Sequence, residues 1–115
     1  MAIIAAYENT ATIGTVEYSL PNNSTTLTPI TVDGVYQVFI DLAALTLGDV
    51  YVLNIYERVV NAGTQRLVST STVGGPLLQP HYVTPSLILL HGWDVTLKKS
   101  SGTDRSIGWS IRQVA

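Results

Sequence analysis

The sequence predicts an all-β protein in which two antiparallel sheets pack face to face as a β-sandwich. Threonine, valine and isoleucine supply 36 of the 115 residues, and such β-branched side chains fit the pleated surface of a sheet. Apolar and polar residues alternate in several segments of strand length, which is the pattern of half-buried strands. Turn residues separate these segments at roughly ten-residue spacing, which is typical of sandwich folds.

The alternating segments give seven or eight expected strands, and their number and spacing favour a jelly-roll or an immunoglobulin-like sandwich. Residues 2–7 are small and apolar, so we expect an N-terminal arm or edge strand in residues 1–12 and the sandwich domain in residues 13–115. The strands expected within that domain are residues 13–20, 34–42, 50–60, 65–73, 82–90, 93–98 and 106–112.

One short helical crossover between the sheets is expected at residues 41–45. Asp41 is a plausible N-cap for the Leu-Ala-Ala-Leu segment that follows it, because an aspartate side chain can accept hydrogen bonds from the first free backbone N–H groups of a helix. Gly48 ends the segment after about one turn.

The clearest pattern lies near the C-terminus and predicts a β-hairpin that turns at Gly102. Three apolar residues before the turn and three after it alternate with polar residues, and folding at Gly102 brings each apolar residue opposite another. A slip of one residue would move the whole set to the wrong face of the sheet. The expected core residues are Trp93, Val95, Leu97, Ile107, Trp109 and Ile111.

The composition narrows the functional class. Charged residues make up 12% of the chain, hydrophobic residues make up 46%, and the net charge is −2. Ordinary soluble domains carry about 25% charged residues, so we expect this protein to cover much of its surface in an assembly. The six scattered lysines and arginines form no basic stripe, which argues against nucleic acid as a partner. The N-terminal segment lacks a basic region and is too short to span a membrane, which indicates a soluble protein made in the cytoplasm.

No motif for catalysis or cofactor binding appears in the sequence. The absence of cysteine excludes thiol chemistry and a cysteine zinc site, and neither a nucleophile elbow nor a phosphate loop is present. The eight carboxylates stand singly. His81, His91 and Asp94 could form at most a weak metal site, and ordinary hydrogen bonding is the better interpretation of both histidines. We therefore expect a protein that is not an enzyme and has no cofactor.

The two tryptophans allow a second interpretation. In carbohydrate-binding modules, aromatic rings on a sheet face stack on sugars, and Trp93, Tyr82 and Asp94 would form such a site here. Core packing is the preferred interpretation, because Trp93 and Trp109 both lie on the apolar face of the expected hairpin.

Two segments resemble parts of small all-β virion proteins of tailed bacteriophages: residues 41–58 (DLAALTLGDVYVLNIYER) and residues 86–97 (SLILLHGWDVTL). The resemblance implies a capsid decoration (cement) protein in the virion, made in the cytoplasm of the bacterial host. Its partners would be the major capsid protein or other virion proteins, and it would form a homo-oligomer, with a trimer as the expected state. A neck or tail component of the same particle is the alternative.

Assembly of this kind would use strands whose second face is also apolar. The residues expected to make contacts there are Val35, Phe39, Ile55 and Val59. Ile3, Ile4 and Tyr7 of the N-terminal arm would add a strand to the sheet edge of another subunit. Residues 48–53 (GDVYVL) also resemble the tyrosine corner of immunoglobulin-type sandwiches, in which Tyr51 would bond back to the preceding crossover.

Overall fold

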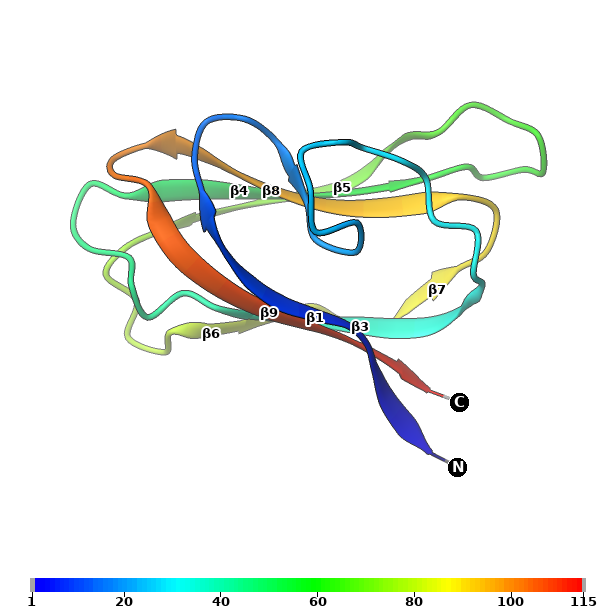
Figure 1. Ribbon diagram of the computed structural model, residues 1–115, viewed down its shortest axis with the longest axis horizontal. Coiled ribbons are helices and arrows are strands. Elements are labelled where there is room, and N and C mark those ends of the chain that lie inside the picture. The colour runs from blue at the N-terminus through cyan, green and yellow to red at the C-terminus, as the bar shows by residue number, and fades with distance from the viewer. Residues whose placement is uncertain (1, 115) are drawn as a thin grey trace.

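Figure 1 shows the computed structural model of the protein, which describes residues 2–114. All regular secondary structure in this range consists of β-strands, so the predicted all-β class is confirmed. The strands are β1 (Ile3–Ile13), β2 (Tyr18–Ser19), β3 (Gly34–Asp41), β4 (Val50–Glu57), β5 (Arg66–Gly74), β6 (His81–Val83), β7 (Leu87–Leu89), β8 (Trp93–Ser101) and β9 (Arg105–Val114).

The strands form two antiparallel sheets packed together, as the sequence predicts (Figure 1). Sheet A has the order β1-β9-β3, and both β6 and β7 pair with β3; sheet B has the order β2-β8-β4-β5. The pairs are nested along the chain: β1 pairs with β9, β2 with β8, β3 with β6 and β7, and β4 with β5. Successive pairs alternate between sheet A and sheet B. The chain therefore follows the path of one long two-stranded ribbon that is wound around the core.

The prediction of a β-hairpin that turns at Gly102 is wrong. β8 lies in sheet B and β9 lies in sheet A, so the two strands are not hydrogen-bonded neighbours, and the chain crosses between the sheets at residues 102–104. The two apolar rows belong to opposite sheets and pack in the core between them. All six of these side chains are at most 4% exposed: Trp93, Val95, Leu97, Ile107, Trp109 and Ile111.

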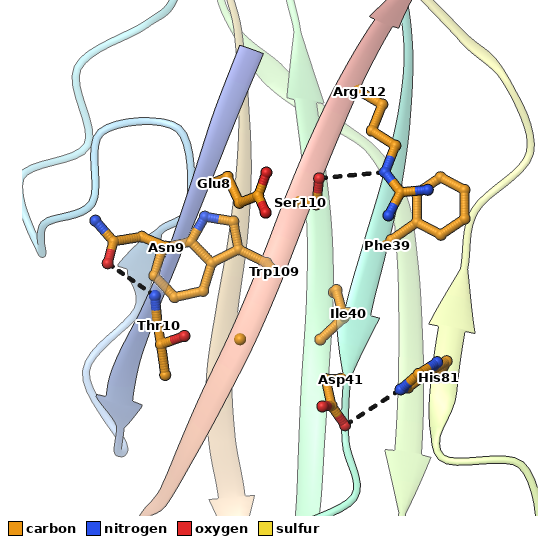
Figure 2. Close-up of a pocket in the computed structure, with 11 residues that line it drawn as sticks. Glu8, Asn9, Thr10, Phe39, Ile40, Asp41, His81, Trp109, Ser110 and Arg112 are labelled. Carbon is orange, nitrogen blue, oxygen red and sulfur yellow. Dashed lines mark hydrogen bonds and ion pairs between the residues drawn. The ribbon is translucent and has the colours of Figure 1, made fainter. Parts of the chain in front are cut away.

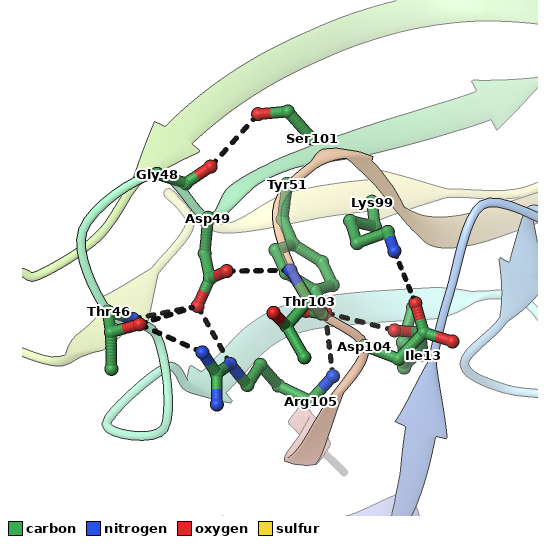
Figure 3. Close-up of polar contacts among 10 residues, drawn as sticks. All are labelled: Ile13, Thr46, Gly48, Asp49, Tyr51, Lys99, Ser101, Thr103, Asp104 and Arg105. Atoms are coloured by element: carbon green, nitrogen blue, oxygen red, sulfur yellow. Dashed lines mark hydrogen bonds and ion pairs between the residues drawn. The ribbon is translucent and has the colours of Figure 1, made fainter.

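A network around Asp49 holds the crossing from β8 to β9 in place (Figure 3). The backbone N–H groups of Thr46 and Thr103 and the Nε of Arg105 each donate to the Asp49 carboxylate at 2.8 Å. These hydrogen bonds, led by those from the backbone, hold the pKa of Asp49 well below its usual range. Gly102 has a φ of 92°, and a Cβ there would collide with Asp49, so the crossing requires glycine.

Tyr51 lies beside this network and does not form the tyrosine corner that the immunoglobulin resemblance implied. Its hydroxyl lies 3.0 Å from the carbonyl oxygens of both Ile13 and Thr103, and it accepts a hydrogen bond from the Arg105 N–H at 2.9 Å. Tyr51 therefore ties β4 to the end of β1 and the start of β9 rather than to the crossover before β4 (Figure 3).

The prediction of a short helix at residues 41–45 is also wrong, and no helix occurs elsewhere in residues 2–114. The Asp41 carboxylate accepts the N–H of Ala43 at 3.0 Å, and the N–H of Leu45 bonds to the carbonyl of Leu42 at 3.1 Å. The result is a turn that buries Leu42 and Leu45. A second helical turn does not follow, because Gly48 has a φ of 92° and the Thr46 N–H donates to the Asp49 carboxylate; a single isolated turn is unstable.

The strand predicted at residues 13–20 is largely a connection between the sheets. Ile13 ends β1, and only Tyr18 and Ser19 form a strand in sheet B. Residues 3–13 form an edge strand paired with β9 along its length rather than a free arm. The expected domain boundary at residue 13 therefore falls at the end of a strand of sheet A.

The strand predicted at residues 82–90 is interrupted at Pro85, which lacks the N–H needed for a ladder. Thr84 bridges the gap between β6 and β7: its N–H donates to the Val38 carbonyl at 3.0 Å, and its hydroxyl accepts from the Val38 N–H at 3.1 Å. Both short strands consequently remain attached to β3.

The two tryptophans fix the long connection between β2 and β3. The indole N–H of Trp93 donates to the carbonyl of Val32, and that of Trp109 donates to the carbonyl of Leu20, both at 3.0 Å. A buried indole needs such a partner for its polar N–H group. The aromatic ring of Tyr36 lies 4.7 Å from that of Trp93, measured between centroids, so the rings and the connection pack as one unit.

Candidate interaction surface

The outer face of sheet A carries a row of apolar side chains that crosses four strands. On β3, Tyr36, Val38 and Ile40 are buried, so the alternating position Val35 points outward. Residues directly opposite in a ladder share a face. Val35 lies opposite Val114 on β9 and Ile88 on β7, and Val114 lies opposite Ile3 on β1.

Phe39 and Val83 extend this row along β3 and β6. Phe39 is four residues beyond Val35 on the same face, and it lies opposite Val83. We call the combined surface the apolar patch: Ile3, Val35, Phe39, Val83, Ile88 and Val114. Ile88 is 81% exposed and Ile3 is 68% exposed. Gln37 and its ladder partner Arg112 lie between the pair of Phe39 and Val83 and the rest of the apolar patch. Exposed apolar surface that crosses several strands typically marks a site of interaction with another protein.

The aromatic ring of Phe39 is not free to stack on a ligand. The guanidinium carbon of Arg112 lies 3.9 Å from the ring centroid, and the Arg112 Nε lies 3.3 Å from the Ser110 hydroxyl (Figure 2). This cation–π contact covers one face of the ring and places a positive charge within the apolar patch, between Val35 and Phe39.

A polar pocket of about 340 Å³ adjoins the apolar patch on the same face of sheet A (Figure 2). It lies over β9, which contributes Gly108 and Ser110, between larger side chains from the neighbouring strands. A Cβ at Gly108 would lie 3.2 Å from the Thr10 hydroxyl oxygen and would begin to fill the pocket. The other lining residues include Glu8, Asn9, Asp41 and His81. The pocket therefore offers hydrogen-bonding groups beside apolar ones, and it shares Phe39 with the apolar patch.

Three of the seven residues predicted as assembly contacts, Ile3, Val35 and Phe39, lie together in the apolar patch. Ile4 and Tyr7 do not belong to it. Ile4 occupies the position next to Ile3, on the opposite face of β1. The ring of Tyr7 packs edge-on against the buried ring of Trp93, with 5.8 Å between the ring centroids.

The predictions for two further contact residues differ from the structure. Ile55 is 4% exposed and belongs to the core, because it occupies an inward position of β4; its prediction as a contact is wrong. Val59 is 80% exposed, but it lies in the loop between β4 and β5 of sheet B and is separate from the apolar patch.

Three residues of the apolar patch were missed: Val83, Ile88 and Val114. In a continuous strand, Val83 and Ile88 would point to opposite faces, because they are five positions apart and side chains alternate with a period of two. The interruption at Pro85 resets this alternation and brings both to the outer face. Pro85 in the sequence signals that the strand is interrupted. Which face the residues after it occupy depends on how many residues separate β6 from β7.

Sheet B carries a separate cluster of two carboxyl groups that look isolated in the sequence. Asp94 is 2% exposed, and its carboxylate accepts hydrogen bonds from the Ser19 hydroxyl at 2.6 Å and the Val95 N–H at 2.8 Å. Glu17 accepts from the hydroxyl groups of Thr96 and Tyr56.

The surroundings shift the pKa values of Asp94 and Glu17 in opposite directions. Burial raises the pKa of Asp94 to about 6. Burial also raises the pKa of Glu17, but hydrogen bonds from Thr96, Tyr56 and Asn54 outweigh it and lower the pKa overall. Glycosidases use carboxyl pairs with separated pKa values. Neither the polar pocket nor the opening between β5 and β7 is lined by Glu17 or Asp94, and the low exposure of Asp94 keeps it from a substrate.

The residues considered for metal and sugar binding do not converge. His81 lies on β6 in sheet A and Asp94 on β8 in sheet B. Within residues 2–114, no group of three or more histidine, aspartate or glutamate side chains could hold a metal ion. Trp93 is in the core, and the Tyr82 hydroxyl donates to Ser71 at 2.9 Å. The sugar site of the alternative interpretation, with Trp93, Tyr82 and Asp94, is therefore not formed.

No protein-family model matches the chain, and comparison with curated proteins and with solved structures also gives no match. In the part of the chain that the structure describes, no helix has the length and apolar character needed to cross a membrane. The functional interpretation therefore depends on the geometry of this chain itself.

Proposed function

We propose that this protein is a structural component of a virus particle, of the capsid decoration type found in tailed bacteriophages, and that it binds the shell through the apolar patch. The observation that carries this proposal is the apolar row that crosses four strands of sheet A and is covered by no part of residues 2–114. The resemblance of residues 41–58 and 86–97 to small virion proteins supports the same class.

The strand order supports a jelly-roll assignment for the sandwich. Eight-stranded jelly rolls are built from two Greek keys and recur in viral capsid and lectin domains. The nested pairs of this chain follow that plan when β6 and β7 are counted as one interrupted strand. Immunoglobulin sandwiches instead place their first two strands in the same sheet, whereas β1 and β2 lie in different sheets here.

A decoration protein stabilises the assembled shell because it binds the shell and not the separated subunits, which shifts the equilibrium by mass action. The low charge of the chain suits this role, since a surface that is covered in the particle needs few charged groups for solubility. Arg112 beside Phe39 and the hydrogen-bonding groups of the polar pocket would set the orientation of the contact, because polar groups contribute specificity more than affinity.

Co-sedimentation with particles that lack this protein tests the proposal. We expect the unaltered chain to sediment with the shells and Ile88→Asp to remain in the supernatant. A matched control is Thr70→Asp, which changes an exposed position on β5 of sheet B and should bind normally. Equal binding of the two variants would contradict a role for the apolar patch, and failure of the unaltered chain to bind would contradict the decoration function.

A further inference from the structure

Sheet A ends at β1, and the free edge of this strand lacks the usual features that prevent pairing with another strand. β1 has eleven residues. It contains no proline, lysine or arginine, and Glu8 is its only charged residue. An edge strand of this kind presents a row of unpaired backbone N–H and C=O groups, which natural proteins normally protect.

The other sheet edges carry such protection. β2 has two residues, and β6 and β7 have three residues each with Pro85 between them. β5 has nine residues, two fewer than β1, and it begins with a charged arginine; its ladder with β4 is irregular at Val68, and such irregularities disfavour pairing at an edge. Among the strands of residues 2–114, β1 is therefore the longest edge strand.

The backbone N–H of Thr10 points to this open edge. Its hydrogen-bond acceptor is the side-chain oxygen of the adjacent Asn9 at 2.8 Å, a local contact outside the ladder with β9. In antiparallel pairs, every second residue directs its backbone groups to the same neighbour, so Glu8 and Thr12 also face the open edge. We propose that β1 pairs antiparallel with β1 of a second copy of this chain, around a two-fold axis at Thr10.

The register of this pairing follows from the regular part of the strand. β1 is irregular between Ala5 and Tyr7, which leaves Tyr7–Ile13 as a regular segment with Thr10 at its middle. When the two copies of Thr10 face each other, Glu8 faces Thr12, Tyr7 faces Ile13, and no like charges meet. A two-fold axis at Glu8 would instead bring two carboxylates together.

The dimer also determines where the apolar patches lie. A two-fold axis perpendicular to the sheet turns the outer faces of both copies of sheet A to the same side. Both patches would then contact one surface, and such bivalent binding raises the overall affinity without new contacts. The dimer itself does not require the proposed function, and it replaces the expected trimer with a two-fold assembly.

A single cysteine tests the pairing in the intact chain, which has no cysteine of its own. Directly opposite residues in a hydrogen-bonded antiparallel pair have Cα atoms about 5.5 Å apart, within the span of about 4.4–6.8 Å that a disulfide bridges. Under mild oxidation, we expect Thr10→Cys to form a disulfide-linked dimer. Thr70→Cys, at an exposed position of the β5 edge, is the matched control and should stay monomeric.

Sedimentation equilibrium of the unaltered chain should give the mass of a dimer. Thr10→Lys places two positive charges opposite each other and should raise the dissociation constant several-fold, whereas Thr70→Lys should leave it unchanged; circular dichroism checks that both variants fold. A monomer or a trimer, or equal cross-linking of the two cysteine variants, would overturn the proposal. Because purified protein is used without particles, failure here is distinct from failure of shell binding.

Discussion

Replacing Asp94 by asparagine should stabilise the protein at neutral pH, even though the Asp94 side chain is buried and hydrogen-bonded. Burial raises the pKa of this carboxyl group from 3.8 to about 6, because the charged form loses hydration that its two hydrogen bonds only partly replace. The nearby Glu17 adds a smaller repulsion. Asparagine keeps an oxygen that can accept from Ser19 and Val95, but it carries no charge.

The sign of the effect follows from proton linkage. The folded protein holds the Asp94 proton more tightly than the unfolded chain, so this contribution to stability is complete below pH 3.8 and is lost as the pH rises through about 6. A difference of about two pKa units corresponds to about 3 kcal/mol. We therefore expect Asp94→Asn to match the unaltered protein near pH 3.5 and to exceed its free energy of unfolding by about 2–3 kcal/mol at pH 7.5.

Urea unfolding between pH 3.5 and pH 8 measures this difference, because titrations common to both proteins cancel in the comparison. Glu17→Gln provides a control of opposite sign: hydrogen bonds lower the pKa of Glu17, so its contribution is present at neutral pH and is lost on acidification. That variant should be less stable than the unaltered protein at pH 7.5. A difference between Asp94→Asn and the unaltered protein that does not change with pH would refute the assignment of Asp94 as a buried carboxyl with a raised pKa.

Three further substitutions test the packing. Trp109→Ala should lower the free energy of unfolding by about 3–5 kcal/mol, and a variant with an unchanged thermal midpoint would contradict its place in the core. Tyr51→Phe should cost about 1–3 kcal/mol in urea unfolding, because the N–H of Arg105 loses its acceptor and the carbonyls of Ile13 and Thr103 lose the one hydroxyl proton that lies between them; a loss near zero would mean that water replaces the hydroxyl. Ile88→Lys should change stability by less than about 0.5 kcal/mol while raising solubility in ammonium sulfate, and unchanged solubility would argue that Ile88 is not part of an exposed apolar surface.

The strand faces were predictable from the sequence, but the strand partners were not. Alternation identifies which side of β8 and β9 is buried, because a core-facing row must be apolar in either arrangement. The same two rows satisfy a hairpin, in which they share one sheet, and a crossing between sheets, in which they meet in the core. Hydrogen bonds from Thr46, Thr103 and Arg105 to Asp49 favour the crossing, and Asp49 is more than 50 residues from Gly102 in the chain.

The candidate surface was predictable only in part for a related reason. Val35 and Phe39 stood out because β3 is apolar on both faces. Ile88 and Val83 join them only through the ladder with β3, and the break at Pro85 changes which face each occupies. The Asp94 and Glu17 cluster was not predictable, because the two residues are distant in the chain and meet only through the pairing of β2 with β8.

Cryo-electron microscopy of the phage particle that is proposed to carry this chain, at a resolution that shows side chains, tests the central proposal most directly. We expect many copies over the shell, with Val35 and Ile88 buried against capsid subunits and the outer face of sheet A turned inward. Copies restricted to one vertex would indicate a neck or tail component instead. A particle without the protein, or with the apolar patch open to solvent, would contradict the account.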